Sequence, residues 1–178
     1  MTVLWLLLLM GNPNPAAGGP AESSEFKGPA QAARGHKIFV DEANATHCGT
    51  CHALAHEGTA VGPDLTRLAR LNARAIVMAI RATRTQYVQS VKPKNGKEFP
   101  GMPAAHDEQM AQFYDLSSKP PVLRKLDRKE IEAVSDNSEW KHPPAGAGYT
   151  AAQLADVIAF IKWVAYGDTK GVAAEDVE

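Results

Sequence analysis

The chain has 178 residues, of which 44% are hydrophobic, and its formal net charge at pH 7 is −1. This length allows one domain, with a core large enough to bury a cofactor. So small a net charge predicts neither nucleic-acid binding nor a polybasic contact with a membrane surface.

Residues 1–10 form a compact apolar run, which is too short to span a bilayer but matches the hydrophobic part of a signal peptide in length. No Lys or Arg precedes this run, and a linker rich in Gly, Pro and Ala follows at residues 11–20. We therefore expect residues 1–21 to be a signal peptide and linker, and residues 22–178 to form the mature domain. That domain is expected in the periplasm or otherwise exported, without stable membrane insertion.

Residues 31–39 are predicted to form the first helix, with Ile38 and Phe39 available for packing. Gly35 lies inside this helix, where a glycine costs about 1 kcal/mol relative to alanine. Such a glycine needs a structural reason, and we expect a close crossing with another helix at this position.

Both cysteines of the chain lie in the pentapeptide Cys48-Gly49-Thr50-Cys51-His52. A CxxCH motif of this kind is the attachment site of a c-type haem. Two thiols three positions apart on one helical turn can form thioether bonds with the two vinyl groups of one porphyrin. His52 follows at once, so its imidazole is placed to become the proximal ligand of the iron. We therefore predict one covalent haem c.

Two other kinds of site compete for the CxxC spacing. A thioredoxin-like dithiol would need a strand before the motif and alternating βαβ units, whereas residues 30–42 have a helical pattern. A zinc site would need two further ligands, and since no other cysteine exists these would come from His47, His52 or His56.

Asn72 is predicted to cap a helix that runs to about residue 83. From residue 87 hydrophobic and polar residues alternate, and residues 94–97, Lys-Asn-Gly-Lys, predict a hairpin with a type I′ turn. Further short strands are predicted at 97–103, 109–116 and 122–126, before a helical turn at 127–131. Residues 87–127 are thus expected to form a β insert.

The last helix is predicted to begin after Thr150, because Thr150 and Gln153 have the spacing of a capping box, and to end at Gly167. Its Phe160 and Trp163 are expected to meet the first helix near Gly35. Residues 168–178 are expected to be frayed.

The CxxCH motif, residues 35–39 (Gly-His-Lys-Ile-Phe) and residues 62–65 (Gly-Pro-Asp-Leu) together resemble a class I monohaem cytochrome c, over residues 31–166. More narrowly, the chain resembles bacterial haem-binding cytochrome c domains that contain a β insert. The resemblance implies a mainly α fold, with N-terminal, middle and C-terminal helices around one haem and a small antiparallel β insert before the last helix. It also implies that the carbonyl of Pro63 accepts a hydrogen bond from the proximal histidine, and that Leu65 and Leu68 line the haem pocket.

Two residues compete for the sixth, distal position on the iron. Where the family has a Met-Pro pair, this chain has His142-Pro143, so the alignment favours His142. The local sequence favours Met102, because this methionine also precedes a proline in a segment rich in Gly and Pro. It falls, however, on a predicted strand. Imidazole in place of a thioether would lower the reduction potential. The remaining histidines, at positions 36, 47, 56 and 106, are expected to be solvent-facing or structural.

These features predict an exported one-electron carrier rather than an enzyme, exchanging electrons with redox proteins such as a dehydrogenase, an oxidase or a reductase. The alternative is a haem enzyme or a gas or redox sensor with an open sixth position, which requires that neither His142 nor Met102 binds the iron. A third possibility is a dithiol oxidoreductase without haem.

Overall fold

The computed structural model describes residues 26–54, 56–82, 87–104, 108–143 and 148–178. The expected signal peptide and linker, residues 1–21, lie outside this range. Among the described residues, no helix combines the length and the apolar character that crossing a membrane requires.

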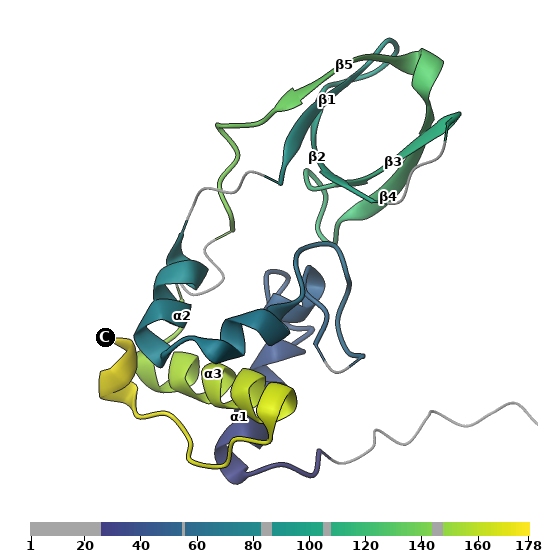
Figure 1. Ribbon diagram of the computed structural model, residues 1–178. Helices are drawn as coiled ribbons and strands as arrows, with labels where there is room; N and C mark the ends of the chain where they lie inside the picture. The colour runs from purple at the N-terminus through teal and green to yellow at the C-terminus, as the bar shows by residue number, and fades with distance from the viewer. Residues whose placement is uncertain (1–25, 55, 83–86, 105–107, 144–147) are drawn as a thin grey trace, which may run out of the picture.

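Three α-helices form one side of the molecule: α1 (Ala30–Phe39), α2 (Ala73–Arg81) and α3 (Ala151–Tyr166). Short 3₁₀ turns lie at η1 (Cys48–Thr50), η2 (Leu65–Arg70), η3 (Arg128–Glu130) and η4 (Ala174–Val177). Figure 1 shows α1, α2 and α3 gathered below a separate set of strands. The N-terminal, middle and C-terminal helices of the expected fold are therefore present.

The helices α1 and α3 cross closely at Gly35. A Cβ atom at Gly35 would overlap the backbone oxygen of Asp156 and would lie 2.9 Å from the Cβ of Phe160. The ring of Phe160 also contacts Phe39, at 5.4 Å between centroids. The close crossing predicted from the helical glycine is thus confirmed, and it contributes to a core cluster with Ala32 and Ile161.

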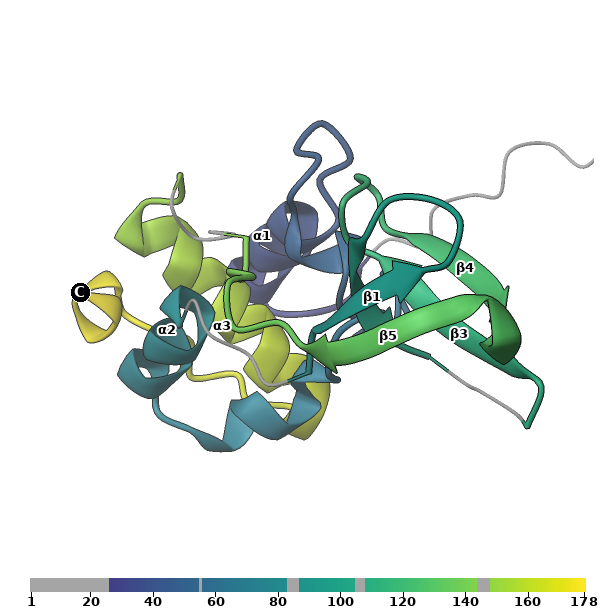
Figure 2. The same ribbon diagram turned by 90° about the horizontal axis from the view of Figure 1, so that it is seen from above.

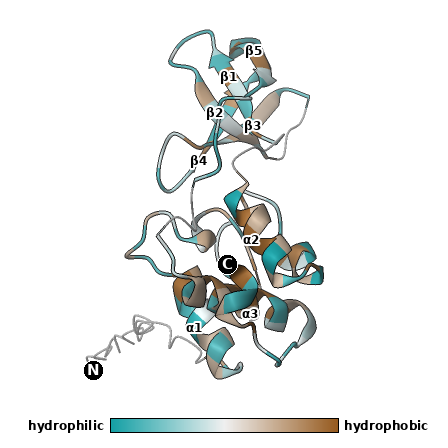
Figure 3. Cartoon of the chain, turned by 90° about the vertical axis from the view of Figure 1, so that its left-hand side faces the viewer, coloured by the Kyte–Doolittle hydropathy of each residue, from teal (hydrophilic) through white to brown (hydrophobic). Residues whose placement is uncertain are grey.

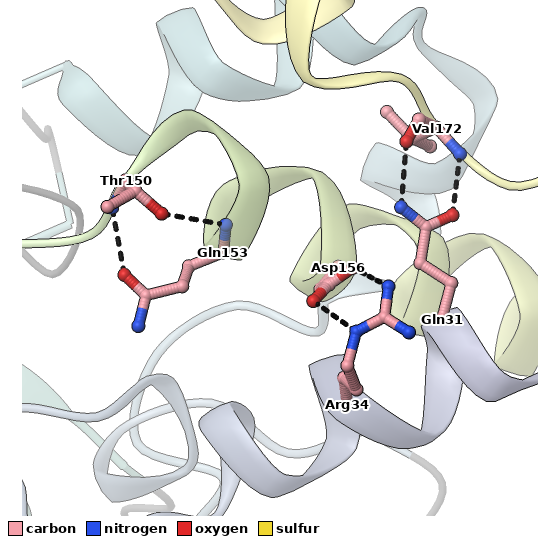
Figure 4. Close-up of polar contacts among 6 residues, drawn as sticks. All are labelled: Gln31, Arg34, Thr150, Gln153, Asp156 and Val172. Carbon is pink, nitrogen blue, oxygen red and sulfur yellow. Dashed lines mark hydrogen bonds and ion pairs between the residues drawn. The ribbon is translucent and has the colours of Figure 1, made fainter.

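Polar contacts fix the relative position of α1 and α3 (Figure 4). Arg34 donates two hydrogen bonds of 2.8 Å to the carboxylate of Asp156, which is 8% exposed. The capping box at the start of α3 is also present, since Thr150 Oγ1 accepts from the backbone of Gln153 and the Gln153 side chain accepts from the backbone of Thr150. At its other end, α3 stops at Gly167 with a left-handed φ of 66°.

The tail after α3 is ordered, so the expectation of a frayed end is wrong. The Gln31 side chain donates to the carbonyl of Val172 and accepts from its N–H, at 2.7 and 2.9 Å. Val177, in η4, is 1% exposed and packs in a second core cluster with Ile76 and Ile158. Burial of apolar surface between α2 and α3 therefore holds the tail in place.

The helix α2 begins where predicted, because the Asn72 side chain accepts a hydrogen bond from the backbone of Ala75. It ends at Arg81, two residues before the predicted end. Ile76 and Val77 are its buried residues, and they face the same cluster as Val177.

Five antiparallel strands form one sheet: β1 (Gln89–Pro93), β2 (Phe99–Pro103), β3 (Met110–Asp115), β4 (Val122–Asp127) and β5 (Ile131–Asp136). Their spatial order is β4-β3-β2-β1-β5, so β4 and β5 are the two edges. Figure 2, from above, also places the sheet beside the helices. With a sheet of this size the expected mainly α class is not confirmed, although the helical framework and the antiparallel insert are present.

Two details of the sheet differ from the sequence-based expectation. The strand β5 was not predicted, yet it pairs along β1, with Val91 opposite Val134. The hairpin between β1 and β2 is present, but its last pair is Val91 with Phe99, which leaves the seven residues between them outside the β1–β2 ladder. Of the two residues at the predicted type I′ turn, only Gly96 has a positive φ, at 121°.

The sheet has a core of its own, separate from the two helical clusters. Val91, Phe99, Ala111 and Phe113 are its buried residues. Figure 3 shows hydrophobic segments both in the helices and in the strands, which agrees with two bodies that each bury apolar surface.

Candidate functional site

The CxxCH segment forms one compact helical turn after α1. The carbonyl of Cys48 accepts hydrogen bonds from the backbone N–H groups of Cys51, at 3.2 Å, and His52, at 2.9 Å. This turn brings the two thiols and the imidazole onto one short element, as the motif predicts. Both cysteines are free thiols rather than a disulfide.

The following loop, residues 57–63, wraps around this turn. Thr59 N–H donates to the carbonyl of Gly49 at 2.9 Å, and Gly62 N–H donates to the carbonyl of Cys51 at 2.6 Å. Gly62 lies against the ligand ring, because a Cβ there would come within 2.7 Å of His52 Cε1. In the sequence this glycine belongs to the Gly-Pro-Asp-Leu segment that carries the family resemblance, but its contact with His52 was not predicted.

The ring of His52 is oriented by the end of that loop. His52 Nδ1 lies 2.7 Å from the carbonyl oxygen of Pro63, which can only accept, so Nδ1 carries the proton. This is the hydrogen bond that the family resemblance implies. It leaves Nε2 as the nitrogen that can bind a metal. Burial lowers the pKa of His52, which favours the neutral, ligating form.

His142 faces His52. The two ring centroids are 6.1 Å apart and the ring planes are inclined by 40°. A metal shared by two imidazoles requires a separation of about 6 Å, since each metal–nitrogen bond is about 2 Å and each nitrogen lies about 1 Å from its ring centre. The separation therefore suits two axial ligands of one iron.

The surroundings of His142 also suit a ligand. Its Nδ1 is buried and has no hydrogen-bond partner among the described residues, a costly state for a polar atom. Burial, and secondarily the proximity of His52, lower the pKa of His142. A neutral imidazole with an unsatisfied nitrogen is suited to metal coordination.

The segment after β5 sets the position of His142. Asn137 N–H donates to the carbonyl of Val88 at 3.1 Å, which ties this segment to the start of β1. The Asn137 side chain accepts from the backbone of Trp140 at 2.8 Å. The Trp140 ring then stands edge-on to His142, with centroids 6.2 Å apart and planes at 88°. Asn137 and Trp140 were missed, and the only local signal is that an asparagine in a loop tends to accept hydrogen bonds from nearby backbone.

Met102 lies on the sheet. It occupies β2, opposite Tyr114 of β3 in the ladder, and its side chain is half-buried. Figure 1 shows this part of the sheet above the helices. The structure brings His52 and His142 together, whereas Met102 is paired within the β2–β3 ladder.

Leu65 and Leu68 lie on η2, the turn that follows Pro63. The Asp64 side chain caps η2 by accepting from the backbone of Thr66 at 2.6 Å. Leu65 is half-buried against the cluster around α1, and Leu68 against the cluster around α2. Both leucines therefore follow closely in the chain after the loop that holds His52. That they line the haem pocket stays a prediction.

The two competing kinds of site, a zinc site and a redox-active dithiol, have less support. Among the described residues, no group of three or more His, Cys, Asp or Glu side chains could hold a metal ion, which counts against zinc. Burial raises the pKa of the Cys48 thiol to about 11, whereas a redox-active cysteine needs a lowered pKa. His47 has a structural contact, from Nδ1 to the carbonyl of Asn44 at 2.7 Å.

The residues on this side of the molecule fit a covalently attached haem. Two thiols on one turn and an oriented imidazole are the groups that attach and ligate haem c, and a second imidazole lies at a separation that would suit the other side of the iron. Bound there, haem c supplies a change of one electron at its iron. The protein supplies the thioether links, the axial nitrogens and the exclusion of water.

Comparison with known proteins agrees with this arrangement. The sequence profile of the family described as cytochrome c matches residues 32–136, which is more than half of the chain. The matched range runs from α1 to β5 and ends before His142. No curated protein matches the chain.

Proposed function

The chain belongs to the cytochrome c family, whose members bind haem and carry electrons, and on this premise we propose that it is an exported one-electron carrier with two histidine axial ligands. His52 is the proximal ligand and His142 the distal ligand. The haem is a covalently bound haem c, attached through Cys48 and Cys51.

The observation that carries the ligand assignment is the separation of 6.1 Å between the rings of His52 and His142. It is supported by the buried, unpartnered nitrogen of His142. Two strong nitrogen ligands complete the coordination of the iron, so no position remains where a substrate or gas could bind directly. This supports a carrier rather than an enzyme.

Export is supported by the apolar run at residues 1–10 and by the family, since haem is attached through thioethers outside the cytoplasm. The mature protein is then periplasmic or otherwise exported and has no stable membrane insertion. Its partners are redox proteins, a dehydrogenase that donates electrons and an oxidase or reductase that accepts them. Contacts of this type are usually small and transient.

The test is the absorption spectrum of the purified protein together with its reaction with carbon monoxide. We expect a low-spin oxidised spectrum without the weak far-red band that methionine–iron(III) coordination gives, and slow reaction of the reduced protein with carbon monoxide. If the far-red band is present, Met102 replaces His142 as the ligand. If carbon monoxide binds at once, the sixth position is open and the protein is a haem enzyme or sensor.

A further inference from the structure

A contact between His36 and Glu57 ties the loop beside the haem motif to α1. His36 Nε2 lies 2.5 Å from Glu57 Oε2. The His36 side chain is 18% exposed and that of Glu57 43%. The imidazole is held from two further sides, stacked on Phe26 with centroids 4.7 Å apart and inclined to Phe160 at 5.2 Å. His36 is thus packed within the helical core, and Glu57 attaches the loop to it.

From Glu57 the backbone leads directly to the ligand ring. Leu54 and Glu57 exchange two backbone hydrogen bonds of 3.0 and 3.1 Å, which closes a tight turn. Gly58, with a φ of 77°, follows and lies against the backbone oxygen of His52. Five residues further on, the carbonyl of Pro63 accepts the hydrogen bond of His52 Nδ1. Glu57 and Pro63 thus lie in one short loop, which the hydrogen bonds of Thr59 and Gly62 also fasten to the haem motif.

We propose that His36 and Glu57 form a positioning pair that keeps the Pro63 carbonyl in hydrogen-bond contact with His52 and thereby sets the reduction potential. This inference rests on the proposed role of His52 as proximal ligand. The pair touches neither the haem motif nor the ligand ring, and it acts through the loop.

The sign of the effect follows from ligand basicity. Donation from Nδ1 to a carbonyl makes the imidazole a more basic ligand, and a more basic ligand favours iron(III) over iron(II). If the pair is broken and the hydrogen bond to Pro63 weakens, iron(III) is favoured less. The reduction potential then rises.

Two single variants separate positioning from a simple effect of charge. His36→Phe keeps a ring against Phe26 and Phe160 but removes the hydrogen bond, and Glu57→Ala removes the acceptor. If the pair acts by positioning the loop, both variants raise the reduction potential. If it acts only through its charges, loss of the anion at Glu57 raises the reduction potential, while loss of His36 lowers it or leaves it unchanged.

A matched control separates positioning from loss of stability. Arg34→Gln breaks a different polar contact of the same helix, the ion pair with Asp156, which does not involve the loop. It should lower the unfolding temperature but leave the potential at the wild-type value. The double variant, His36→Phe with Glu57→Ala, should shift the potential no further than the larger single shift, because the two residues act as one unit.

The experiment is an equilibrium redox titration of the four purified haem-loaded variants, with thermal unfolding measured in parallel. Nuclear magnetic resonance of the reduced protein follows solvent exchange of the His52 Nδ1 proton. We expect upward shifts in potential and faster exchange of this proton in both single variants. Opposite shifts in the two variants, an unchanged potential in either, or an equal shift in Arg34→Gln would overturn the proposal. Rapid carbon monoxide binding by the wild type would contradict the carrier function alone, since the titration reports on the proximal side.

Discussion

At the residue scale, the site depends on which nitrogen each imidazole ring leaves free. His52 uses Nδ1 for the Pro63 carbonyl, so its Nε2 is the nitrogen that could bind a metal. His142 has a buried nitrogen without a partner among the described residues, and it faces His52 across a space suited to one metal. A methionine at position 142 would instead offer a thioether sulfur, which raises the potential of a haem.

The variant His142→Met tests the distal ligand. We expect the potential to rise by on the order of 100 mV, within the roughly 0.8 V range that axial ligands span. The oxidised spectrum should gain the far-red band of methionine coordination. Redox titration and absorption spectroscopy measure both.

Met102→Leu is the control for this substitution, because it removes the other candidate sulfur while keeping the size and polarity of a strand residue. Its spectrum and potential should match those of the wild type. If Met102→Leu changes the coordination and His142→Met does not, the ligand assignment is wrong.

The sequence was sufficient for the proximal half of the site and insufficient for the distal half. The CxxCH turn and the Pro63 hydrogen bond lie within sixteen consecutive residues, where the spacing of the motif predicts the turn and the family resemblance implies the hydrogen bond. The distal side depends on Asn137 and Trp140, whose positions follow from the pairing of β1 with β5. That pairing joins segments some forty residues apart, and sequence spacing says little about such contacts.

At the element scale, the crossing of α1 and α3 depends on the absence of a side chain at position 35. Alanine is favoured over glycine in a helix by about 1 kcal/mol, so local propensity alone predicts that Gly35→Ala stabilises the protein. The added Cβ would overlap a backbone oxygen of α3, which no side-chain rotation can relieve. Overpacking of this kind costs about 1–3 kcal/mol, occasionally more.

We therefore expect Gly35→Ala to lower the free energy of unfolding by about 2 kcal/mol, a steric cost near the upper end of that range less the gain in propensity. Chemical denaturation measures this. Gly148→Ala is the control, since a Cβ there meets nothing within 4 Å. A Gly35→Ala protein as stable as the wild type would show that the two helices do not cross at this residue.

The tail is the second element whose role can be tested. Val177 is 1% exposed between α2 and α3, so Val177→Ala should lower the free energy of unfolding by about 1–3 kcal/mol. The exposed neighbour provides the comparison, because Glu178→Ala should leave stability unchanged within error. Equal stability of the two variants, measured by denaturant titration, would contradict the packing of the tail.

The elements that sequence predicted well are those specified by local contacts. Asn72, Thr150 with Gln153, and Gly167 each act within four residues of the helix end that they define. The missed elements depend on distant partners. The strand β5 is exposed along five of its six residues, so its hydrophobic alternation is weak. Val177 is buried only because α2 and α3 cover it.

At the scale of the whole molecule, the helical body and the sheet each have their own core. The buried cluster of the sheet contains strand residues alone, and the chain leaves and re-enters the helical body at neighbouring points, Val88 and Asn137. Such an arrangement allows the sheet to open without opening the helices.

We expect Phe99→Ala to accelerate amide hydrogen exchange throughout the sheet while the amides of α1 and α3 keep their protection. Loss of a buried phenylalanine costs about 3–5 kcal/mol, which is large for a body of five short strands. Hydrogen exchange followed by mass spectrometry resolves the two bodies. Lys125→Ala, an exposed position on β4, serves as comparison. Equal acceleration in α3 would show that the molecule opens as one unit.

The contact between α1 and α3 also bears on the stage of synthesis at which the helical body can fold. Arg34 and Asp156, which join the two helices, lie 122 positions apart, so the crossing cannot form before nearly the whole chain has been synthesised. Until α3 has been synthesised, α1 has no surface against which to bury its apolar face, and the neighbouring thiols remain open to solvent. Thiols react as thiolates, and in the folded protein burial raises the pKa of Cys48 to about 11. In the folded molecule both cysteines are half-buried, so we expect the thiols to be most accessible for haem attachment before α1 and α3 have closed on each other.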